Sequence, residues 1–564
     1  MPKIEVYEKT LFQYAGKEFS EDELIQVLTC AKAELDDRDE EEGILKIELN
    51  DTNRPDLWST AGLARALRLY TGGDIPVYDF FSNRSEKDGE NRVLVDAGLQ
   101  DIRPYISAFV ITGKPLDEPM LKDLIQTQEK LCWNYGQKRK SIAMGLYRSD
   151  ALSYPVHYRA ADPEKTTFVP LGMEEKLNLR EILEKHPKGI EFGWIVKDFP
   201  MFPYLMDDEG ECLSFPPVIN SAHIGAAQVG DENLFIELTG LDMPTLLLAT
   251  SIVACDCADA GFTVQPVTIE YPYDTPMGKT VTTPLYFQEP VSMDVEYAGK
   301  LLGDEISVQE AADYVKRMGI KSEMNDREIT IYPPEYRNDF LHQVDVVEDV
   351  MIGRGMETFK PVMPTDFTVG RYTPEEEFSR EIKDIMVGLG FQEMVYNYLG
   401  SRRDFIEKMN ISGEKIIRIA NPMSENFEYV RGSILPCLCA SESVSGNAVY
   451  PHNIFEVGKV ALLNPEENYG SSTRNYLGFL TADKQAGFTL ISSHVSALFF
   501  YLSAKYTLEE ADDPRFIKGR GARIICGKDE IGIFGEIHPA VLENWGITMP
   551  CTAGEVDLDY LVRR

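Results

Sequence analysis

Apolar positions follow two different periods along the chain, which indicates that helices and strands are mixed. Short segments rich in apolar and β-branched residues predict strands at residues 44–49, 105–112, 234–239 and 393–399. Apolar residues spaced three and four positions apart predict helices at residues 121–131, 308–318 and 378–389. The pattern therefore predicts an α+β protein.

One further helix is predicted after Tyr332-Pro333-Pro334, where proline excludes helical geometry from the preceding residue. Either Asn338 or Asp339 can cap it. Its apolar positions are Leu341, Val344, Val347, Val350 and Met351, and the glycines at 353 and 355 end it.

Four carboxylates accompany this helix: Asp339 at its N-terminal end, and Asp345, Glu348 and Asp349 on one of its faces. Hard oxygen donors of this kind suit Mg²⁺, which prefers carboxylates and water. The chain contains 92 Asp and Glu residues, however, so on spacing alone a solvated acidic face is the commoner explanation. Both interpretations stay open at this point.

Composition bounds the class of protein. A chain of 564 residues should hold roughly three to five domains. Its net charge of −36 repels nucleic acid, so any RNA contact needs a local basic patch or a partner's surface. We see neither a secretory signal nor an apolar run of the ~18 residues that a membrane span needs, so we expect a cytoplasmic protein. The nine cysteines include no Cys-x-x-Cys, and we expect reduced, mostly buried thiols.

The first domain contains a strand–turn–helix unit, with the turn at Asn53-Arg54-Pro55-Asp56 and the helix ending at Gly72-Gly73. We expect Arg54 and Asp56 to fix the turn rather than to catalyse a reaction. The acidic run at residues 36–42 is predicted to be a surface loop, and the polar segment at residues 81–92 a linker.

Residues 93–270 are predicted to form a mixed α/β domain. Lys138, Arg139 and Lys140 form a basic cluster. Such a trio is more often incidental than functional, but in so acidic a chain it is a candidate phosphate contact. Glu237 and Thr239 lie on the same face of a predicted strand, and the pattern alone favours an exposed face.

Residues 365–564 are predicted to form a single α/β domain. Arg431 is a candidate ATP-binding arginine, but neither an Arg-x-Glu nor a terminal Gly-x-Gly-x-x-Arg setting accompanies it, so we expect no nucleotide site there. Lys518 and Arg520 are candidate RNA contacts. The seven histidines show neither His-x-x-x-His nor His-Glu-x-x-His, the pairings that bind zinc.

Four sets of residues, in order along nearly the whole chain, resemble the phenylalanyl-tRNA synthetase beta subunit family in its short, archaeal/eukaryotic type. They are NRPDLWS from residue 53, PPVINS from residue 216 with ELTG from residue 237, the four acids around residues 339–349, and FGEIHP from residue 534. The resemblance implies a B1-like domain at residues 1–80, a B3/B4-like editing domain at 93–270, a winged-helix-like B5 domain at 271–361 and an inactive catalytic-like B6/B7 domain at 365–564. The last would be built on the antiparallel sheet of class II synthetases.

The resemblance also implies an activity. The family joins L-phenylalanine to its tRNA with ATP, as a cytoplasmic (αβ)₂ heterotetramer in which the alpha subunit carries out activation. Asp339, Asp345, Glu348 and Asp349 would hold a Mg²⁺ shared with alpha. The alternative is a non-catalytic tRNA-binding or scaffold subunit whose editing site is inactive.

Editing has a physical reason, because an apolar pocket rejects a ligand with one added hydroxyl by only about 10². A second site that recognises the hydroxyl can hydrolyse mischarged tyrosyl-tRNA. In the family an acidic residue and a threonine line that site, here Glu237 and Thr239, with Asn220 and Ser221 from the adjacent phrase. No Ser-His-Asp or Cys-His set is evident, so a positioned water is expected to attack. Leu241 departs from the family, which usually has threonine after the glycine.

Overall fold

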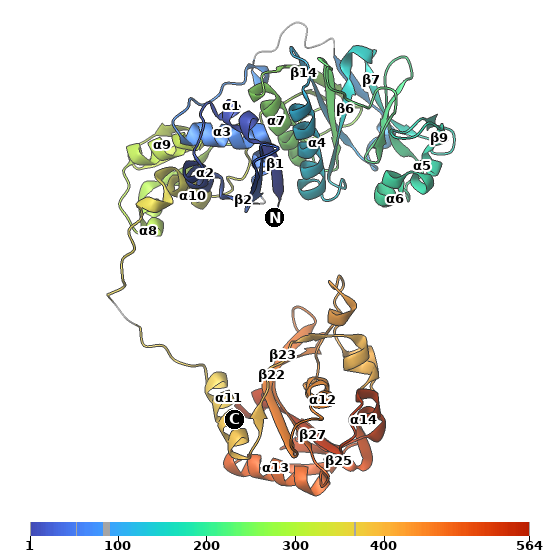
Figure 1. Ribbon diagram of the computed structural model, residues 1–564, viewed down its shortest axis with the longest axis vertical. Helices are drawn as coiled ribbons and strands as arrows, with labels where there is room; N and C mark the ends of the chain where they lie inside the picture. The colour runs from blue at the N-terminus through green and yellow to red at the C-terminus, as the bar shows by residue number, and fades with distance from the viewer. Residues whose placement is uncertain (1, 52, 83–90, 366–367, 563–564) are drawn as a thin grey trace. The chain divides into compact units, whose positions relative to one another are not determined.

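The structure of the chain is a computed structural model, and it describes residues 2–51, 53–82, 91–365 and 368–562. The chain divides into two compact units, Met1–Val362 and Met363–Arg564 (Figure 1). Most of the predicted linker, residues 83–90, lies outside the described residues. Within the described ranges, no helix has the length and apolar character to cross a membrane. All nine cysteines are free and buried, as expected.

A three-stranded antiparallel sheet begins the first unit, in the order β1-β3-β2. Its elements are β1 (Lys3–Tyr7), α1 (Glu8–Ala15), α2 (Glu21–Leu28), β2 (Ala33–Asp39), β3 (Ile44–Leu49) and α3 (Thr60–Tyr70). The loop predicted at residues 36–42 is wrong in its first half, which belongs to β2. Lys3 and Lys46 pair with Asp36 and Asp37 there, and these cations offset the repulsion that made a strand look unfavourable.

The turn between β3 and α3 is held by a buried ion pair. Arg54 donates two hydrogen bonds of 2.8 Å to the carboxylate of Asp56. Ser59 then caps α3 by accepting a hydrogen bond from the backbone of Gly62. The expectation that Arg54 and Asp56 fix this turn is confirmed.

A ten-stranded mixed sheet forms the centre of the first unit. Its strands lie in the order β12-β11-β10-β7-β4-β14-β5-β13-β6, and β15 pairs with β14. Their bounds are β4 (Arg92–Val95), β5 (Tyr105–Thr112), β6 (Ile142–Arg148), β7 (Val156–Ala161), β10 (Phe202–Met206), β11 (Cys212–Phe215), β12 (Ile219–Asn220), β13 (Leu234–Gly240), β14 (Thr263–Glu270) and β15 (Thr280–Thr283). Every residue of β13 is buried, because β5 and β6 flank it and side chains cover both faces. The predicted exposed face at Glu237 and Thr239 is therefore wrong.

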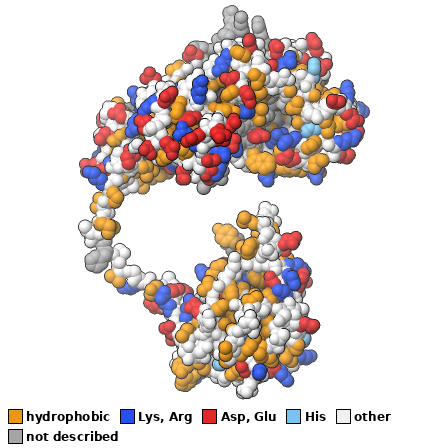
Figure 2. Space-filling model, viewed as in Figure 1, with side chains coloured by type: hydrophobic (Ala, Val, Ile, Leu, Met, Phe, Trp, Pro, Cys, Tyr) orange, Lys and Arg blue, Asp and Glu red, His pale blue; other side chains and the backbone are white. Residues whose placement is uncertain are grey.

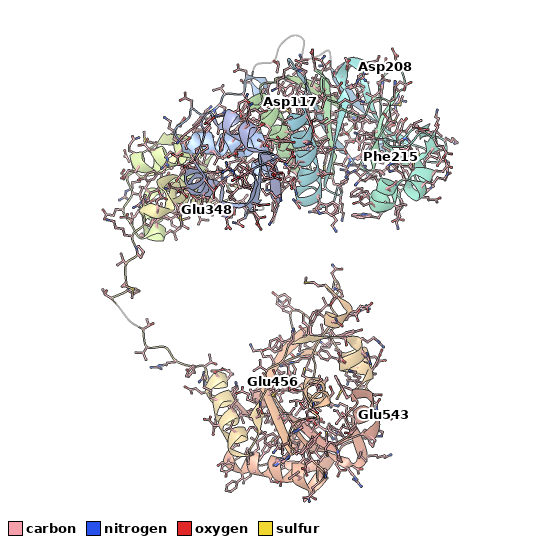
Figure 3. The ribbon with its side chains drawn as sticks, viewed as in Figure 1. Asp117, Asp208, Phe215, Glu348, Glu456 and Glu543 are labelled. Carbon is pink, nitrogen blue, oxygen red and sulfur yellow. The ribbon has the colours of Figure 1, made fainter. Side chains whose placement is uncertain are left out.

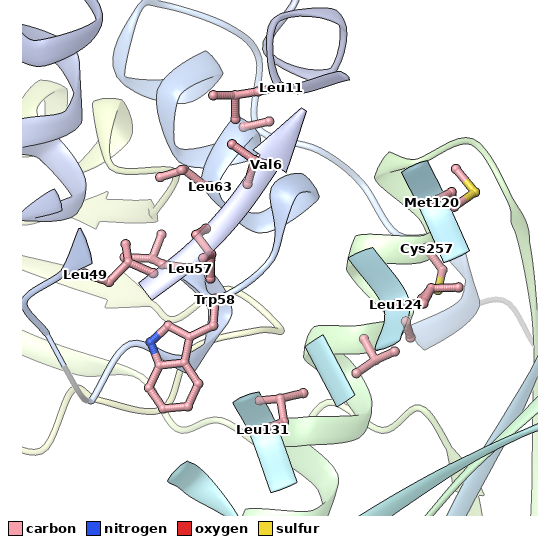
Figure 4. Close-up of a cluster of buried hydrophobic side chains, with 14 of the residues drawn as sticks. Val6, Leu11, Leu49, Leu57, Trp58, Leu63, Met120, Leu124, Leu131 and Cys257 are labelled. Carbon is pink, nitrogen blue, oxygen red and sulfur yellow. The ribbon is translucent and has the colours of Figure 1, made fainter. Parts of the chain in front are cut away.

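Helices α4 (Glu118–Lys130) and α7 (Met243–Asp259) pack on one face of this sheet (Figure 1). Leu124 lies beside Cys257 of α7 (Figure 4). The same core includes Leu131 and continues into the N-terminal sheet through Trp58 and Leu57. At the other end, β8 (Thr167–Phe168), β9 (Leu177–Asn178), α5 (Leu179–Lys185) and α6 (Pro187–Phe192) pack against β10 and β11. Separate clusters of buried residues thus support the two ends of the sheet.

A smaller three-stranded sheet follows, in the order β16-β18-β17. Its elements are β16 (Val291–Asp294), α8 (Val295–Leu302), α9 (Val308–Arg317), β17 (Lys321–Met324), β18 (Glu328–Tyr332) and α10 (Gln343–Arg354). Helix α10 begins later than predicted, because Asp345 accepts hydrogen bonds from the backbone of Leu341 and His342 and so starts the helix at Gln343. Leu341 is 76% exposed and does not join the core.

Buried charges fix these parts of the first unit against one another. Arg65 of α3 binds Asp256 at 3.1 Å and Asp259 at 2.7 Å, both on α7. The same guanidinium lies 3.9 Å from the ring centre of Tyr336, which precedes α10. Removing one member would leave the others buried without a partner, so this junction favours a single arrangement.

The second unit is built on a seven-stranded sheet in the order β19-β22-β23-β27-β26-β25-β24. Its strands are β19 (Gln392–Glu393), β22 (His452–Leu463), β23 (Ser471–Ala482), β24 (Thr507–Glu510), β25 (Phe516–Cys526), β26 (Asp529–Ile537) and β27 (Cys551–Asp557). Its helices are α11 (Pro374–Gly388), α12 (Leu435–Ser443), α13 (Phe488–Tyr501), α14 (Pro539–Trp545) and α15 (Leu558–Val562). All neighbouring strands are antiparallel except β19 and β22.

The strand predicted at residues 393–399 is wrong. Only its two ends pair, one in β19 and the other in β20 (Leu399–Gly400), which binds β21 (Tyr429–Val430). The chain between them leaves the sheet, and Val395 is 85% exposed. An apolar run alone does not supply a neighbouring strand, and pairing decides whether it becomes one.

Candidate active site

A cavity of about 200 Å³ lies in the first unit beside β13, β11 and β12. Its apolar lining consists of Ala143, Met144, Leu171, Phe215, Pro216, Pro217 and Ile219, and its polar lining of Gln128, Arg139, Lys188, Ser214, Asn220 and Glu237. Phe215, labelled in Figure 3, stacks on Phe202 with ring centres 5.5 Å apart, which fixes one wall. The space is smaller than the ~300 Å³ at which pockets for drug-sized ligands begin. It suits a small group with an apolar body.

Glu237 supplies the acidic side of this cavity. The hydroxyl of Tyr147 lies 2.8 Å from its Oε1 and 2.8 Å from the hydroxyl of Ser214. Its other oxygen, Oε2, is buried and has no hydrogen-bond partner among the described residues. Buried polar atoms are rarely left without a partner. The second oxygen of Glu237 is therefore free to accept a hydrogen bond from a ligand.

The surroundings of Glu237 oppose its ionisation. Only 3% of the residue is exposed, and this burial raises the pKa of the carboxyl from 4.5 to about 7. The hydrogen bond from Tyr147 and the charge of Arg103 act in the opposite direction but do not cancel it. Near neutral pH the group thus exchanges between its neutral and charged forms, as perturbed carboxyls at functional sites often do.

Gly145 makes room for this arrangement. It lies directly opposite Glu237 in the pairing of β6 with β13. A Cβ atom at Gly145 would come within 2.0 Å of the Tyr147 hydroxyl and 2.7 Å of Glu237 Oε1. These distances are too short for any side chain, so the hydrogen-bonded pair needs glycine at this position.

Of the four residues predicted for editing, only Glu237 and Asn220 line the cavity. Thr239 is fully buried, and its hydroxyl accepts a hydrogen bond of 2.9 Å from Arg103. Ser221 is buried beside Asn220 and accepts a long hydrogen bond of 3.4 Å from the backbone of Ile224. Thr239 and Ser221 therefore support the strands that carry the lining residues.

Leu241 lies outside the cavity lining and is 41% exposed. Its backbone N–H binds the carbonyl of Ser141 just after β13 ends. The departure from the family at this position therefore leaves the polarity of the cavity unchanged.

Sequence reasoning missed several lining or supporting residues. Tyr147, Ser214, Gln128 and Lys188 were not singled out, although Tyr147 lies in the buried strand that follows the basic cluster. Only the strand register shows that Tyr147 and Glu237 meet. Arg139, predicted as an RNA contact, lines the cavity, while Lys138 and Lys140 are exposed nearby.

The four acids around α10 do not fit a metal ion as they are arranged. Arg337 binds both Asp339, at 2.6 Å, and Asp349, at 2.8 Å. Asp345 caps the helix, and Glu348, labelled in Figure 3, pairs with Lys32. Although burial raises the pKa of Asp339, the Arg337 guanidinium outweighs it and holds that pKa at about 2. Nowhere in the described ranges do three His, Cys, Asp or Glu residues gather closely enough to hold a metal.

The candidate ATP- and RNA-binding residues of the second unit either form ion pairs within the fold or are exposed on its surface. Arg431 is fully buried and donates two hydrogen bonds, of 2.7 and 3.0 Å, to Glu456, which is labelled in Figure 3. Arg520 forms an ion pair of 2.5 Å with Glu536 of the neighbouring strand. Lys518 is exposed on the same strand. Acidic and basic side chains are interspersed over the visible face of the first unit (Figure 2).

Comparisons with known proteins agree across the chain. Residues 1–73 match the Phe-tRNA synthetase beta subunit B1 domain, residues 291–356 the tRNA synthetase B5 domain, and residues 360–558 the phenylalanyl-tRNA synthetase beta chain CLM domain. A solved N-terminal fragment of the phenylalanyl-tRNA synthetase beta subunit from Pyrococcus horikoshii is 34% identical, with a TM-score of 0.59. It covers 63% of this chain, and all of the fragment is matched.

Full-length relatives include the phenylalanine–tRNA ligase beta subunits of Borreliella burgdorferi strain ZS7 and Borreliella afzelii strain PKo. Each is 48% identical, over 567 and 569 residues, and 100% of both chains is covered. These relatives are bacterial, so the archaeal/eukaryotic qualifier of the resemblance is not shown. The chain belongs to the phenylalanyl-tRNA synthetase beta subunit family, and it is a subunit of a phenylalanine–tRNA ligase.

Proposed function

We propose that this chain works in the cytoplasm with an alpha subunit, in an (αβ)₂ heterotetramer that charges tRNA(Phe) with L-phenylalanine. Ligases of this family use ATP and Mg²⁺, and activation belongs to alpha. The chain's own task is to hydrolyse tyrosyl-tRNA(Phe). Its proposed domains are B1-like at residues 1–80, B3/B4-like at 93–270, winged-helix-like B5 at 271–361 and B6/B7-like at 365–564, the last on a class II synthetase-like sheet.

The observation that carries the editing proposal is the unpartnered oxygen of Glu237, a residue that lines a cavity with apolar side chains on another part of its wall. An aromatic ring can lie against Met144, Phe215 and Ile219, which line the same space. The hydroxyl of tyrosine can then donate its proton to Glu237 Oε2. Phenylalanine would leave that oxygen without a partner, and a site built to bond a hydroxyl disfavours a ligand that lacks one.

The hydrolysis itself needs a water rather than a protein nucleophile. No histidine or cysteine is among the lining residues, which are all described. A water attacks the carbonyl carbon of the ester and gives up a proton, the bond from that carbon to the ribose oxygen breaks, and that oxygen takes up a proton. Tyrosine and free tRNA result. The cavity contributes by holding the tyrosine side chain so that the ester stays at its open mouth.

The second unit supports a role without nucleotide chemistry. Arg431, the candidate ATP-binding arginine, is hydrogen-bonded to Glu456.

The acids around α10, in the first unit, already have partners: Arg337, Lys32 and the backbone at the start of the helix. A site shared with alpha would first have to release them from these partners.

The test uses the chain alone and the chain mixed with its alpha subunit. We expect phenylalanine charging only in the mixture, and hydrolysis of added tyrosyl-tRNA(Phe) by the mixture. Charging by this chain alone would refute the assignment of activation to alpha. A charging-competent mixture that leaves tyrosyl-tRNA intact would refute editing and would favour a scaffold or tRNA-binding subunit.

A further inference from the structure

The hydroxyl of a buried tyrosine connects two residues that line the Glu237 cavity, although the tyrosine itself does not line it. Tyr147 of β6 is fully buried, and its Oη lies 2.8 Å from Glu237 Oε1 and 2.8 Å from Ser214 Oγ. Glu237 belongs to β13 and Ser214 to β11, and these strands stand near opposite ends of the sheet order. Tyr147 therefore joins the two ends of the sheet at the cavity.

The hydrogen atoms at this contact point in only one direction when Glu237 is ionised. An ionised carboxylate accepts hydrogen bonds and donates none, and a hydroxyl has one proton to donate. Tyr147 then donates to Glu237 Oε1, and Ser214 is left to donate to Tyr147. Burial, followed by the charge of Glu237, raises the pKa of Tyr147 well above its ordinary value, so the hydroxyl keeps its proton. Oε1 of Glu237 is thus occupied whenever the carboxyl is charged.

The ring that carries this hydroxyl has little freedom. Tyr147 packs against Phe235, with ring centres 6.1 Å apart, and both rings are fully buried. A Cβ atom at Gly145 would lie 2.0 Å from the hydroxyl, so the backbone surrounds it closely. The carboxyl of a glutamate, by contrast, turns easily about its last bond. Tyr147 is therefore the fixed partner, and it decides which carboxyl oxygen remains for a ligand.

We propose that Tyr147 is a positioning residue for tyrosine recognition: its hydroxyl holds Oε1 of Glu237, so that Oε2 remains as the acceptor for the hydroxyl of a tyrosine side chain in the cavity. Oε2 is buried and has no hydrogen-bond partner among the described residues. The inference rests on the proposed editing function and deepens it. An acceptor that is held in place before the ligand arrives lowers the cost of ordering it on binding.

The same hydrogen bond affects the ionisation of Glu237. The other charged or titratable groups around the carboxyl are Arg103, Tyr158, Cys132 and the cavity-lining Arg139 and Lys188. Within the described ranges, only Tyr147 donates a hydrogen bond to the Glu237 side chain. Burial raises the pKa of Glu237, and the bond from Tyr147 lowers it in part. Without that bond the carboxyl ionises at a higher pH, and the preference for the tyrosyl ester develops at a higher pH as well.

The test is single-turnover hydrolysis of tyrosyl- and phenylalanyl-tRNA(Phe) by the complex with alpha, for wild type and Tyr147→Phe between pH 6 and pH 8. At pH 7 the variant should lower the rate ratio of the tyrosyl to the phenylalanyl ester by about 10-fold, the scale of one hydrogen bond to a charged group. Its ratio should also rise at a higher pH than in the wild type. A wild-type ratio and pH profile in Tyr147→Phe, or equal slowing of both esters, would overturn the inference.

Two further variants separate positioning from a general loss of buried hydroxyls. Tyr158→Phe is the matched control, because Tyr158 is fully buried in β7 and its hydroxyl donates to the carbonyl of Arg103. It should keep the wild-type ratio. Ser214→Ala keeps the bond from Tyr147 to Glu237 and should reduce the ratio less than Tyr147→Phe does. An equal loss in Tyr158→Phe, or a larger loss in Ser214→Ala, would also contradict the positioning role.

A binding measurement separates this inference from the editing proposal. Calorimetry with L-tyrosinamide and L-phenylalaninamide uses the full chain without alpha. The wild type should bind tyrosinamide more tightly, and Tyr147→Phe should reduce that preference by about 10-fold. A preference that depends on Tyr147, in a complex that hydrolyses neither ester, would refute editing and leave the positioning role intact. Hydrolysis of tyrosyl-tRNA with its full preference in Tyr147→Phe would refute the positioning role and leave editing intact.

Discussion

Replacing Glu237 with Gln removes the one ionisable group of the cavity whose pKa burial raises to about 7. The shift from 4.5, at about 1.4 kcal/mol per pKa unit, corresponds to about 3 kcal/mol of folding stability. The protonated carboxyl is favoured in the folded chain. This contribution is therefore complete below pH 4.5 and is lost as the pH rises toward 7.

About 1 kcal/mol of this change falls between pH 6 and pH 8, if the unfolded carboxyl titrates at its ordinary value. Glutamine keeps an oxygen for Tyr147 but cannot ionise. The wild-type chain should therefore lose stability relative to Glu237→Gln over this interval. Any constant effect of burying the amide cancels when the two pH values are compared.

Hydrogen exchange of the β13 amides, corrected for the intrinsic exchange rate at each pH, measures this difference in the full chain. Tyr147→Phe is the control, because it keeps the carboxyl and removes one hydrogen bond that lowers its pKa. That variant should lose stability over the same interval at least as steeply as the wild type, because its Glu237 pKa is no longer lowered by this bond. Parallel pH dependence in wild type and Glu237→Gln would show that Glu237 is not a buried, high-pKa acid.

Three further results are expected. Gly145→Ala should destabilise the first unit by about 1–3 kcal/mol, because the added Cβ overlaps Tyr147. Gly388→Ala is the control, because its added Cβ meets open space and should leave stability unchanged. Thermal unfolding of both variants measures the difference. Arg337→Met should cost about 3–5 kcal/mol by leaving Asp349 buried without its cation, and a loss under about 1 kcal/mol in denaturant unfolding would contradict the described pairing. Adding Mg²⁺ or a chelator should not shift the melting temperature of the chain without alpha, because the four acids already have partners; a clear shift in calorimetry would show an ion site there.

Local patterns predicted local structure well. Strands β3 and β5 and helices α4 and α9 fall at or within a few residues of their predicted positions, because a period of two or of 3.6 residues reflects burial on one side of an element. The failed strand at residues 393–399 has the right composition but lacks a partner along most of its length. The sequence of one segment does not show which distant segment will pair with it.

The site shows the same limit. The resemblance pointed to Glu237 and Asn220, which line the cavity, and also to Thr239 and Ser221, which do not. The contact of Glu237 with Tyr147 depends on the register of β6 against β13. A shift of one residue in β13 would place the Glu237 side chain on the opposite face of the sheet. The acids around α10 show a related limit, since their spacing could not show that Arg337 binds Asp339 and Asp349.

The most direct test compares single-turnover hydrolysis of tyrosyl- and phenylalanyl-tRNA(Phe) by the complex with alpha, for wild type and Glu237→Gln, at pH 6 and pH 8. The wild type should prefer the tyrosyl ester, and its rate ratio should rise with pH as Glu237 ionises and binds the phenolic hydroxyl more strongly. General effects of pH on esters cancel in the ratio. In Glu237→Gln the ratio should be lower and independent of pH. Equal ratios in both proteins at both pH values would contradict the assignment of Glu237 to tyrosine recognition.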